Sequence, residues 1–338
     1  MEGASEDVSE DVSEDVSEDV SEDMTKDMSK DVSSDIAEPH PPSRDEFSHP
    51  CTCKKEEEMV KIITDTTAGL SDQIVERYDI PVIPQVIIFG TDSYLEGREI
   101  DHATFMEKLQ ASKQLPKTSA PPPELFVEAF ERLVPRGEPI LCIHPSTDLS
   151  GTVRSATVAA ADFPDADIRI IDTRLIGSPM ATLVKLGAQW AEAGHEADAI
   201  EERLCDMIPR SRVYFLVATL EYLAKNGRIG DAAALLGSVL QVKPILTLRD
   251  GRADQFERTR TQKRAVARLK DLVLEQIPGD GSGHLSVMHA AVPDEAQALA
   301  DDLRSTLDLD DVPILDVPPA IVTHAGPGVL AVAFFVAD

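Results

Sequence analysis

Residues 140–161 read ILCIHPSTDLSGTVRSATVAAA, and this stretch decides the fold class. The apolar run at 140–143 is typical of a buried strand, and residues 151–161 have the length and composition of a helix. The loop between them is rich in hydroxyls and ends in Ser150-Gly151-Thr152. A strand that passes through such a loop into a helix predicts a βαβ unit on a parallel sheet.

The same alternation continues on both sides of this stretch. We expect further strands at 59–64, 81–89 and 168–171, and helices at 71–78, 102–111, 122–133 and 179–193. Gly90-Thr91-Asp92 breaks the second of these strands as a hairpin turn would. Short Ile- and Val-rich runs that alternate with helices predict an α/β domain over residues 59–207.

The pattern changes near residues 205–212, where we place a domain boundary. Strands are then expected at 213–219, 242–248, 252–258, 285–291, 312–317 and 329–336, with helices at 220–225, 231–240, 261–276 and 293–307. The Asp250-Gly251 turn predicts an antiparallel pair on either side of it. The expected fold class is therefore α/β with two domains, a parallel-sheet domain followed by a smaller α+β domain over residues 208–338.

The formal net charge of −29 is concentrated at the amino terminus. Residues 1–58 carry 20 acidic and 5 basic side chains, a net of −15, which leaves −14 for the remaining 280 residues. Ser5-Glu6-Asp7-Val8 begins a four-residue motif that occurs four times in succession, and prolines follow it. Residues 1–58 are thus predicted to be a disordered acidic low-complexity tail and linker. So acidic a chain is a poor partner for nucleic acid or for anionic lipid.

The sequence also limits the cellular setting and the metal chemistry. It shows neither the pattern of a signal peptide nor a run of about 18 apolar residues, so we expect a cytoplasmic protein with no membrane span. Four scattered cysteines favour a reducing compartment. His49, Cys51 and Cys53 offer part of a zinc site, but a complete site needs a fourth ligand, and we expect no metal.

Four loops could carry a small anion, since loops past the carboxyl ends of parallel strands are where ligands bind. They are rich in hydroxyls or glycine and cover residues 64–67, 117–121, 146–152 and 323–328. Ser and Thr also cap helices without any ligand, and this alternative stays open for each loop. His324 is expected on a tight turn before the last strand, where it could donate a hydrogen bond, act as a base, or bond to a backbone carbonyl. No nucleotide-binding, zinc-protease or serine-hydrolase motif is present.

Several motifs resemble the DegV family in their order and spacing. They are Thr64-Asp65-Thr66-Thr67-Ala68, Ile83-Pro84, Lys117-Thr118-Ser119-Ala120-Pro121, Asp148-Leu149-Ser150-Gly151-Thr152, Ile171-Asp172-Thr173, Leu220-Glu221-Tyr222-Leu223, Gly227-Arg228-Ile229, Lys243-Pro244-Ile245-Leu246 and Thr323-His324-Ala325-Gly326-Pro327-Gly328. The resemblance covers residues 59–338. Val153-Arg154 and Pro145-Ser146-Thr147 depart from the family's usual residues at the edge of the third loop.

The resemblance implies a protein that binds a long-chain fatty acid such as palmitate between its two domains, for lipid transport or fatty acid metabolism. The carboxylate would be held by the hydroxyl of Thr118 or Ser119, by Ser150 with Gly151, and by His324. No cofactor, metal or catalytic residue is implied. A separate ATP-binding fatty-acid kinase subunit is an implied partner. Arg228, Arg258 and Arg260 are our candidates to contact it or the transferred phosphoryl group, and a solvated helix face is the alternative that stays open for them.

Two other classes of function stay open at this point. In the first, the protein is an enzyme that acts on a small acyl substrate through Ser150 as nucleophile and His324 as base, although the sequence offers no evident third group to orient the histidine. In the second, it is an interaction protein whose working part is the acidic tail. A co-purified lipid would separate both from the fatty-acid-binding function.

Overall fold

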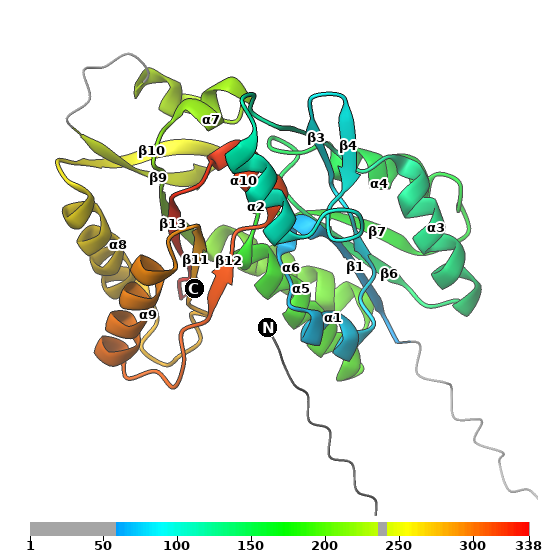
Figure 1. The fold of residues 1–338 in the computed structure, drawn as a ribbon. Helices are drawn as coiled ribbons and strands as arrows, with labels where there is room; N and C mark the ends of the chain where they lie inside the picture. Colours follow the sequence, from blue (N-terminus) through cyan, green and yellow to red (C-terminus); the bar gives the residue numbers. More distant parts are fainter. Residues whose placement is uncertain (1–58, 236–241, 338) are drawn as a thin grey trace, which may run out of the picture. The chain divides into compact units, whose positions relative to one another are not determined.

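In the part of the chain that the structure describes, the strands form three sheets (Figure 1). The computed structural model describes residues 59–235 and 242–337. The acidic repeat, the linker and the His49-Cys51-Cys53 group lie outside the described residues, so their predictions stand as predictions. The expected α/β fold class, with a parallel sheet followed by a mixed α+β part, is confirmed.

The first sheet is parallel throughout, with the order β2-β1-β6-β7. Its strands are β1 (Lys61–Asp65), β2 (Val82–Ile83), β6 (Ile140–His144) and β7 (Ile168–Asp172). Successive residues of β1 point to opposite faces, because side chains alternate along a strand. Ile62 packs toward α5 (Ser178–Glu192) and α6 (Ala197–Met207), whereas Ile63 packs toward α3 (Pro123–Leu133) and α4 (Thr152–Ala160). Burial on both faces explains why β6 begins with the continuous apolar run at residues 140–143.

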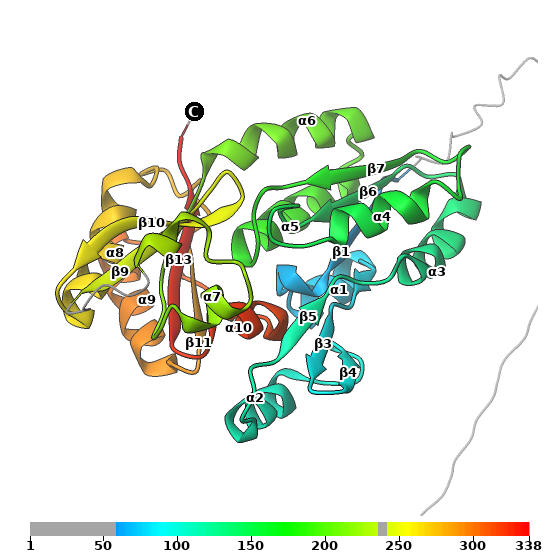
Figure 2. The same ribbon diagram turned by 90° about the horizontal axis from the view of Figure 1, so that it is seen from above.

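The second sheet is mixed, with the order β10-β9-β8-β13-β11-β12. Its strands are β8 (Ser211–Leu216), β9 (Lys243–Arg249), β10 (Arg252–Thr259), β11 (Ser286–Ala290), β12 (Ile314–Asp316) and β13 (Val329–Phe335). Figure 2 shows α8 (Gln262–Gln276) and α9 (Pro293–Leu307) on one side, with α7 (Glu221–Lys225) and α10 (Pro319–Ala325) on the other. The predicted hairpin of β9 and β10 is present and antiparallel.

The third sheet is a small antiparallel one, with the order β4-β3-β5. It consists of β3 (Val86–Phe89), β4 (Asp92–Leu95) and β5 (Lys117–Ser119). The hairpin at Gly90 was expected, but Lys117–Ser119 was expected in a loop and is a strand that pairs with β3. Helices α1 (Asp72–Tyr78) and α2 (His102–Ala111) lie where the sequence predicts them.

Among the described residues, two α-helices were not expected. One is α6, whose buried residues Ala197, Ile200, Leu204 and Met207 have helical spacing. The other is α10, so His324 lies in the last turn of a helix and the predicted tight turn is wrong at that residue. The helix predicted at 231–240 is a 3-10 helix over Gly230–Leu235, and residues 236–241 lie outside the described part.

The division into domains at 205–212 stays a prediction. In that stretch, α6 leads through the 3-10 turn Ile208–Arg210 into β8, the first strand of the mixed sheet in chain order.

Candidate functional site

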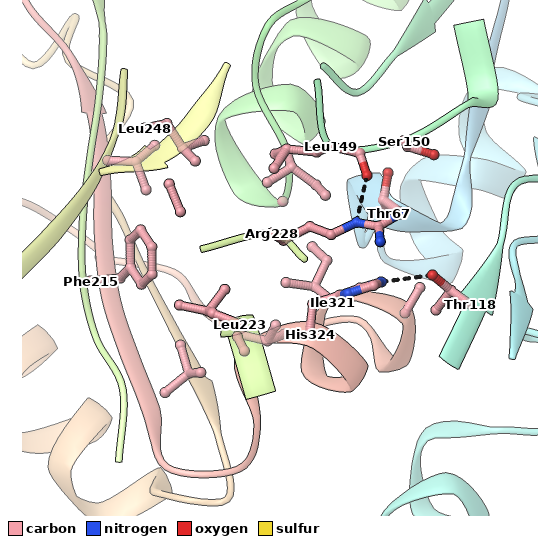
Figure 3. A pocket seen from close by; sticks show the side chains of 18 of the residues that line it. Thr67, Thr118, Leu149, Ser150, Phe215, Leu223, Arg228, Leu248, Ile321 and His324 are labelled. Carbon is pink, nitrogen blue, oxygen red and sulfur yellow. Dashed lines mark hydrogen bonds between the residues drawn. The ribbon is translucent and has the colours of Figure 1, made fainter. Parts of the chain in front are cut away.

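A pocket opens where loops at the carboxyl end of the parallel sheet meet the inner face of the mixed sheet. The empty space inside it, with its opening to solvent included, is about 980 Å³. Figure 3 shows Thr118 and Ser150 at one end of the pocket and Phe215 and Leu248 at the other. This division suits a ligand with one polar group and a long apolar part.

The apolar wall belongs mainly to the mixed sheet. Along β13, Leu330 and Val332 pack with α8 and α9, whereas Ala331 faces the pocket. Ala331 pairs with Phe215 of β8 across the sheet. Because alanine is small, this position leaves room beside the aromatic ring. The remaining apolar lining residues are Ala120, Leu149, Ile176, Val213, Leu223, Leu248, Ala253, Met288, Val317, Ala320, Ile321, Ala325 and Val329.

At the polar end, β5 and α10 bring Thr118 and His324 together. Thr118 Oγ1 lies 2.7 Å from His324 Nε2, although 206 residues separate them. Burial first, and the nearby Arg228 second, lower the pKa of His324 from 6.5 to about 4, so the imidazole is neutral at pH 7. His324 Nδ1 is buried and has no hydrogen-bond partner in the described structure. A neutral imidazole can form a hydrogen bond with Thr118 and does not place a charge in this buried site, where a charge would be unfavourable.

Ser150 and Gly151 line the same end from the loop between β6 and α4. Ser150 Oγ lies 2.7 Å from Thr152 Oγ1 and accepts a longer bond of 3.3 Å from the Thr152 N–H. Gly151 is the N-cap residue of α4, and no side chain caps this helix. The Ser150 hydroxyl nevertheless accepts the first N–H of this helix, so capping explains part of its position, and its place at the pocket is a second feature.

The sequence did not indicate the buried polar group behind Ser150. Asp65, at the end of β1, accepts hydrogen bonds from Gln85 Nε2 (3.0 Å) and lies 2.9 Å from His144 Nδ1. Gln85 Nε2 also donates to Thr152 Oγ1 (2.9 Å). Asp65 lies in the hydroxyl-rich loop 64–67 that the sequence indicates, but its partners Gln85 and His144 are 20 and 79 residues away along the chain.

Glu96 is a second buried group that the sequence did not indicate. One carboxylate oxygen accepts the Ala320 N–H (3.0 Å) at the start of α10, and the other accepts the Thr66 hydroxyl. Burial raises the pKa of Glu96 from 4.5 to about 7, because a charged carboxylate is costly in an apolar surrounding. Glu96 thus ties the loop after β1 to the helix that carries His324.

Of the remaining candidate residues, Arg228 lines the pocket, whereas Ser119, Arg258 and Arg260 do not. Arg228 lines the pocket, donating from Nε to Leu149 O (3.3 Å) and from Nη1 to Asn226 O (2.6 Å). Ser119 is exposed, donates its hydroxyl to Ala120 O (3.2 Å) and does not line the pocket, whereas Thr118 does. Arg258 and Arg260 are exposed near the end of β10, also away from the pocket lining.

Within residues 59–235 and 242–337, no group of three or more His, Cys, Asp or Glu side chains is arranged to hold a metal ion. No helix in the same ranges is long and apolar enough to cross a membrane.

Comparisons with known proteins agree with this architecture. A family model described as "Uncharacterised protein, DegV family" matches residues 59–337. A DegV domain-containing protein of Streptomyces coelicolor is 38% identical over 275 residues, which cover 81% of this chain and 97% of that protein. One from Halalkalibacterium halodurans is 35% identical, with 82% and 98% covered.

Several solved structures with the same fold are described as fatty-acid-binding proteins. A DegV family protein from Thermus thermophilus, described for its fatty acid binding, matches with a TM-score of 0.75 and 29% identity over 82% of this chain and 100% of that chain. DegV from Bacillus subtilis, described as a fatty acid binding protein, matches with a TM-score of 0.74 and 28% identity over 83% and 100%. The family match and the identity of the relatives show that this chain belongs to the DegV family.

Proposed function

We propose that this protein binds a long-chain fatty acid in the pocket between its two predicted domains. The carboxylate would lie at the polar end, near the Thr118 and Ser150 hydroxyls, the Gly151 N–H and His324, and the acyl chain would lie along the mixed sheet. The observation that carries the proposal is a single pocket with hydroxyls and a neutral histidine at one end and an apolar wall along the rest.

Energetics support this ligand class. Burying about 14 methylenes at roughly 0.8 kcal/mol each contributes about 11 kcal/mol before costs. Association and ordering of the chain offset several kcal/mol of that, which leaves a net value compatible with sub-micromolar binding. The acyl chain therefore supplies the affinity, whereas charge-assisted hydrogen bonds orient the carboxylate and replace its lost water.

The geometry supports binding without catalysis. A serine nucleophile needs a base within hydrogen-bond reach. In the described structure, Ser150 Oγ is paired with Thr152 and His324 Nε2 with Thr118, and no hydrogen bond joins Ser150 to His324. We therefore favour a lipid-binding role in transport or fatty acid metabolism, in the cytoplasm, over an acyl-transfer enzyme.

Mass spectrometry of the purified protein tests the proposal first. We expect a co-purified C14–C18 fatty acid, and tight binding of palmitate after delipidation. Ser150→Ala and Thr118→Val should weaken palmitate binding about tenfold each, because a hydrogen bond to a charged group contributes roughly 1.5–3 kcal/mol. Ser119→Ala removes a neighbouring hydroxyl outside the pocket and is the matched control. A protein that neither carries nor binds a fatty acid would refute the proposal.

A finer part of the proposal concerns a partner. The basic surface of Arg258, Arg260, Lys263 and Arg264 stands out in an acidic chain, and in the described part no ion pair neutralises these four side chains. We propose that it docks an acidic ATP-binding kinase subunit, which would phosphorylate the bound carboxylate to an acyl phosphate, with Arg228 near the transferred group. Charge reversal at Arg258 and Arg260 should slow kinase-dependent phosphorylation.

The control for that experiment reverses an equal charge elsewhere. Arg77→Glu with Arg304→Glu changes the net charge by the same amount on α1 and α9. If both double variants lose phosphorylation equally, or neither does, the docking surface is wrong while fatty acid binding stands.

A further inference from the structure

A chain of hydrogen bonds behind the polar end of the pocket begins at a buried carboxylate. Asp65 is fully buried, and its Oδ1 accepts from the Thr67 N–H (3.0 Å), the Thr67 hydroxyl (2.6 Å) and Gln85 Nε2 (3.0 Å). Its Oδ2 lies 2.9 Å from His144 Nδ1. A carboxylate accepts hydrogen bonds and an amide nitrogen only donates them, so the direction of this first link is set.

Asp65 therefore fixes how the Gln85 amide is oriented. If the amide were flipped, its oxygen would face the Asp65 carboxylate and two acceptors would meet in a buried place, which is costly. With the nitrogen facing Asp65, the second hydrogen of the same nitrogen reaches Thr152 Oγ1 at 2.9 Å. Gln85 is itself buried, and its backbone is held by Thr66 Oγ1 and by the Glu96 N–H. Thr152 consequently accepts from Gln85.

The hydrogen bond between Thr152 and Ser150 is the next in the chain, and its direction follows from the previous one. Thr152 is fully buried, and its hydroxyl hydrogen needs an acceptor, which Ser150 Oγ provides at 2.7 Å. When Ser150 accepts from Thr152, its own hydrogen is left to point into the pocket. Thr67 differs, because it also lines the pocket but its hydrogen goes to Asp65.

We propose that Asp65, Gln85 and Thr152 are positioning residues that make Ser150 a hydrogen-bond donor toward a carboxylate ligand. The inference rests on the proposed fatty acid function and adds how the site selects an ionised head group. A carboxylate gains a charge-assisted bond from a hydroxyl that is held as a donor. A fatty alcohol of the same length is neutral and gains less from it. This relay of Asp65, Gln85 and Thr152 therefore favours binding of a fatty acid over binding of a fatty alcohol with the same chain length.

Reversing the relay tests this directly. In Gln85→Glu, the new carboxyl is either ionised or shares a proton with Asp65, and in both states it presents an oxygen to Thr152. Thr152 then donates to residue 85, Ser150 donates to Thr152, and no Ser150 hydrogen faces the ligand. Ser150→Ala should weaken palmitate binding about tenfold in the wild-type background but less than twofold in the Gln85→Glu background. The comparison cancels the direct effect of the added charge, as in any double-mutant cycle.

A second variant breaks the next link without a charge change. Thr152→Val keeps the shape and removes the hydroxyl, so palmitate binding should weaken at least threefold while 1-hexadecanol binding changes less than twofold, and Thr152→Ser should restore palmitate binding. Dissociation constants are measured by calorimetry on delipidated full-length protein. If Gln85→Glu does not fold, the Thr152 pair decides the outcome.

The results separate this inference from the function beneath it. An equal Ser150→Ala penalty in both backgrounds, or an equal loss of palmitate and hexadecanol binding in Thr152→Val, would overturn the relay while fatty acid binding stands. Wild-type protein that does not bind palmitate would overturn both.

Discussion

The neutral state of His324 predicts how acid destabilises the ligand-free protein. Its pKa is about 4 in the folded protein, lowered by burial and then by Arg228, against an ordinary value of 6.5. Between these two values the unfolded chain binds a proton at this ring and the folded protein does not. The contribution of His324 to stability is therefore present above pH 6.5 and is lost as the pH falls toward 4.

The magnitude follows from the same two values. Lowering the pKa from 6.5 to about 4 corresponds to about 3 kcal/mol, at roughly 1.4 kcal/mol for each pH unit. His324→Gln removes the titration but retains a side-chain N–H that can reach Thr118. We expect the free energy of unfolding of the wild type, measured against that of His324→Gln, to fall by up to about 3 kcal/mol between pH 6.5 and pH 4.

Urea unfolding of the two delipidated proteins at half-unit steps from pH 4 to pH 7.5 measures this difference. Other groups, including Glu96, titrate in both proteins and cancel. Arg228→Met should reduce the dependence, because it removes the second cause of the shift. Saturating palmitate should reduce it further, since a carboxylate beside the ring favours the protonated form. Parallel stability curves for wild type and His324→Gln would refute the reasoning.

Three further predictions concern the walls and supports of the site. Glu96 should give a pH dependence of stability opposite to that of His324, because burial raises its pKa from 4.5 to about 7. Its contribution to the free energy of unfolding, about 3 kcal/mol, is therefore lost as the pH rises from 4.5 to 7. Urea unfolding of Glu96→Gln should not show this loss. Ala331→Leu should displace about three methylenes of the acyl chain, weakening palmitate binding by about 2.4 kcal/mol but dodecanoate binding much less in calorimetry. Gly326→Ala places a Cβ 2.6 Å from a Tyr222 ring carbon at a φ of +80°, so it should lower the free energy of unfolding by more than about 1 kcal/mol in urea unfolding. Gly279→Ala is the control. No heavy atom lies within 4 Å of its Cβ, so this variant should change stability little.

The two helices that sequence reasoning missed were missed for different reasons. In α6 the apolar residues do recur at helical spacing, so the pattern was present and was not used. In α10 the segment Ile321-Val322-Thr323 is β-branched, which favours a strand. That helix is held by a contact that only the fold supplies, the Glu96 carboxylate on the Ala320 N–H.

The sequence predicted which loops form the candidate site, but it did not predict the hydrogen bonds and protonation states within it. Thr118, Ser150, Gly151 and His324, which the loops and the family resemblance single out, all line one pocket, and their role in holding a carboxylate stays a prediction. The choice between Thr118 and Ser119 could not be made in advance, because neighbouring residues of a strand point to opposite sides. The strand itself was expected to be a loop.

The sequence by itself determined most of the order of strands and helices, with α6, α10 and β5 as the exceptions, and it determined the parallel sheet, the hydroxyl-rich loops and the family. These depend on hydrophobic period and on turn residues, which are local properties of the chain. Only the tertiary structure decided that His324 is neutral, that Asp65 and Gln85 lie behind Ser150, and that Ala331 leaves room in the wall. Burial and hydrogen-bond direction depend on residues far apart in the chain, so they exist only once the fold has brought those residues together.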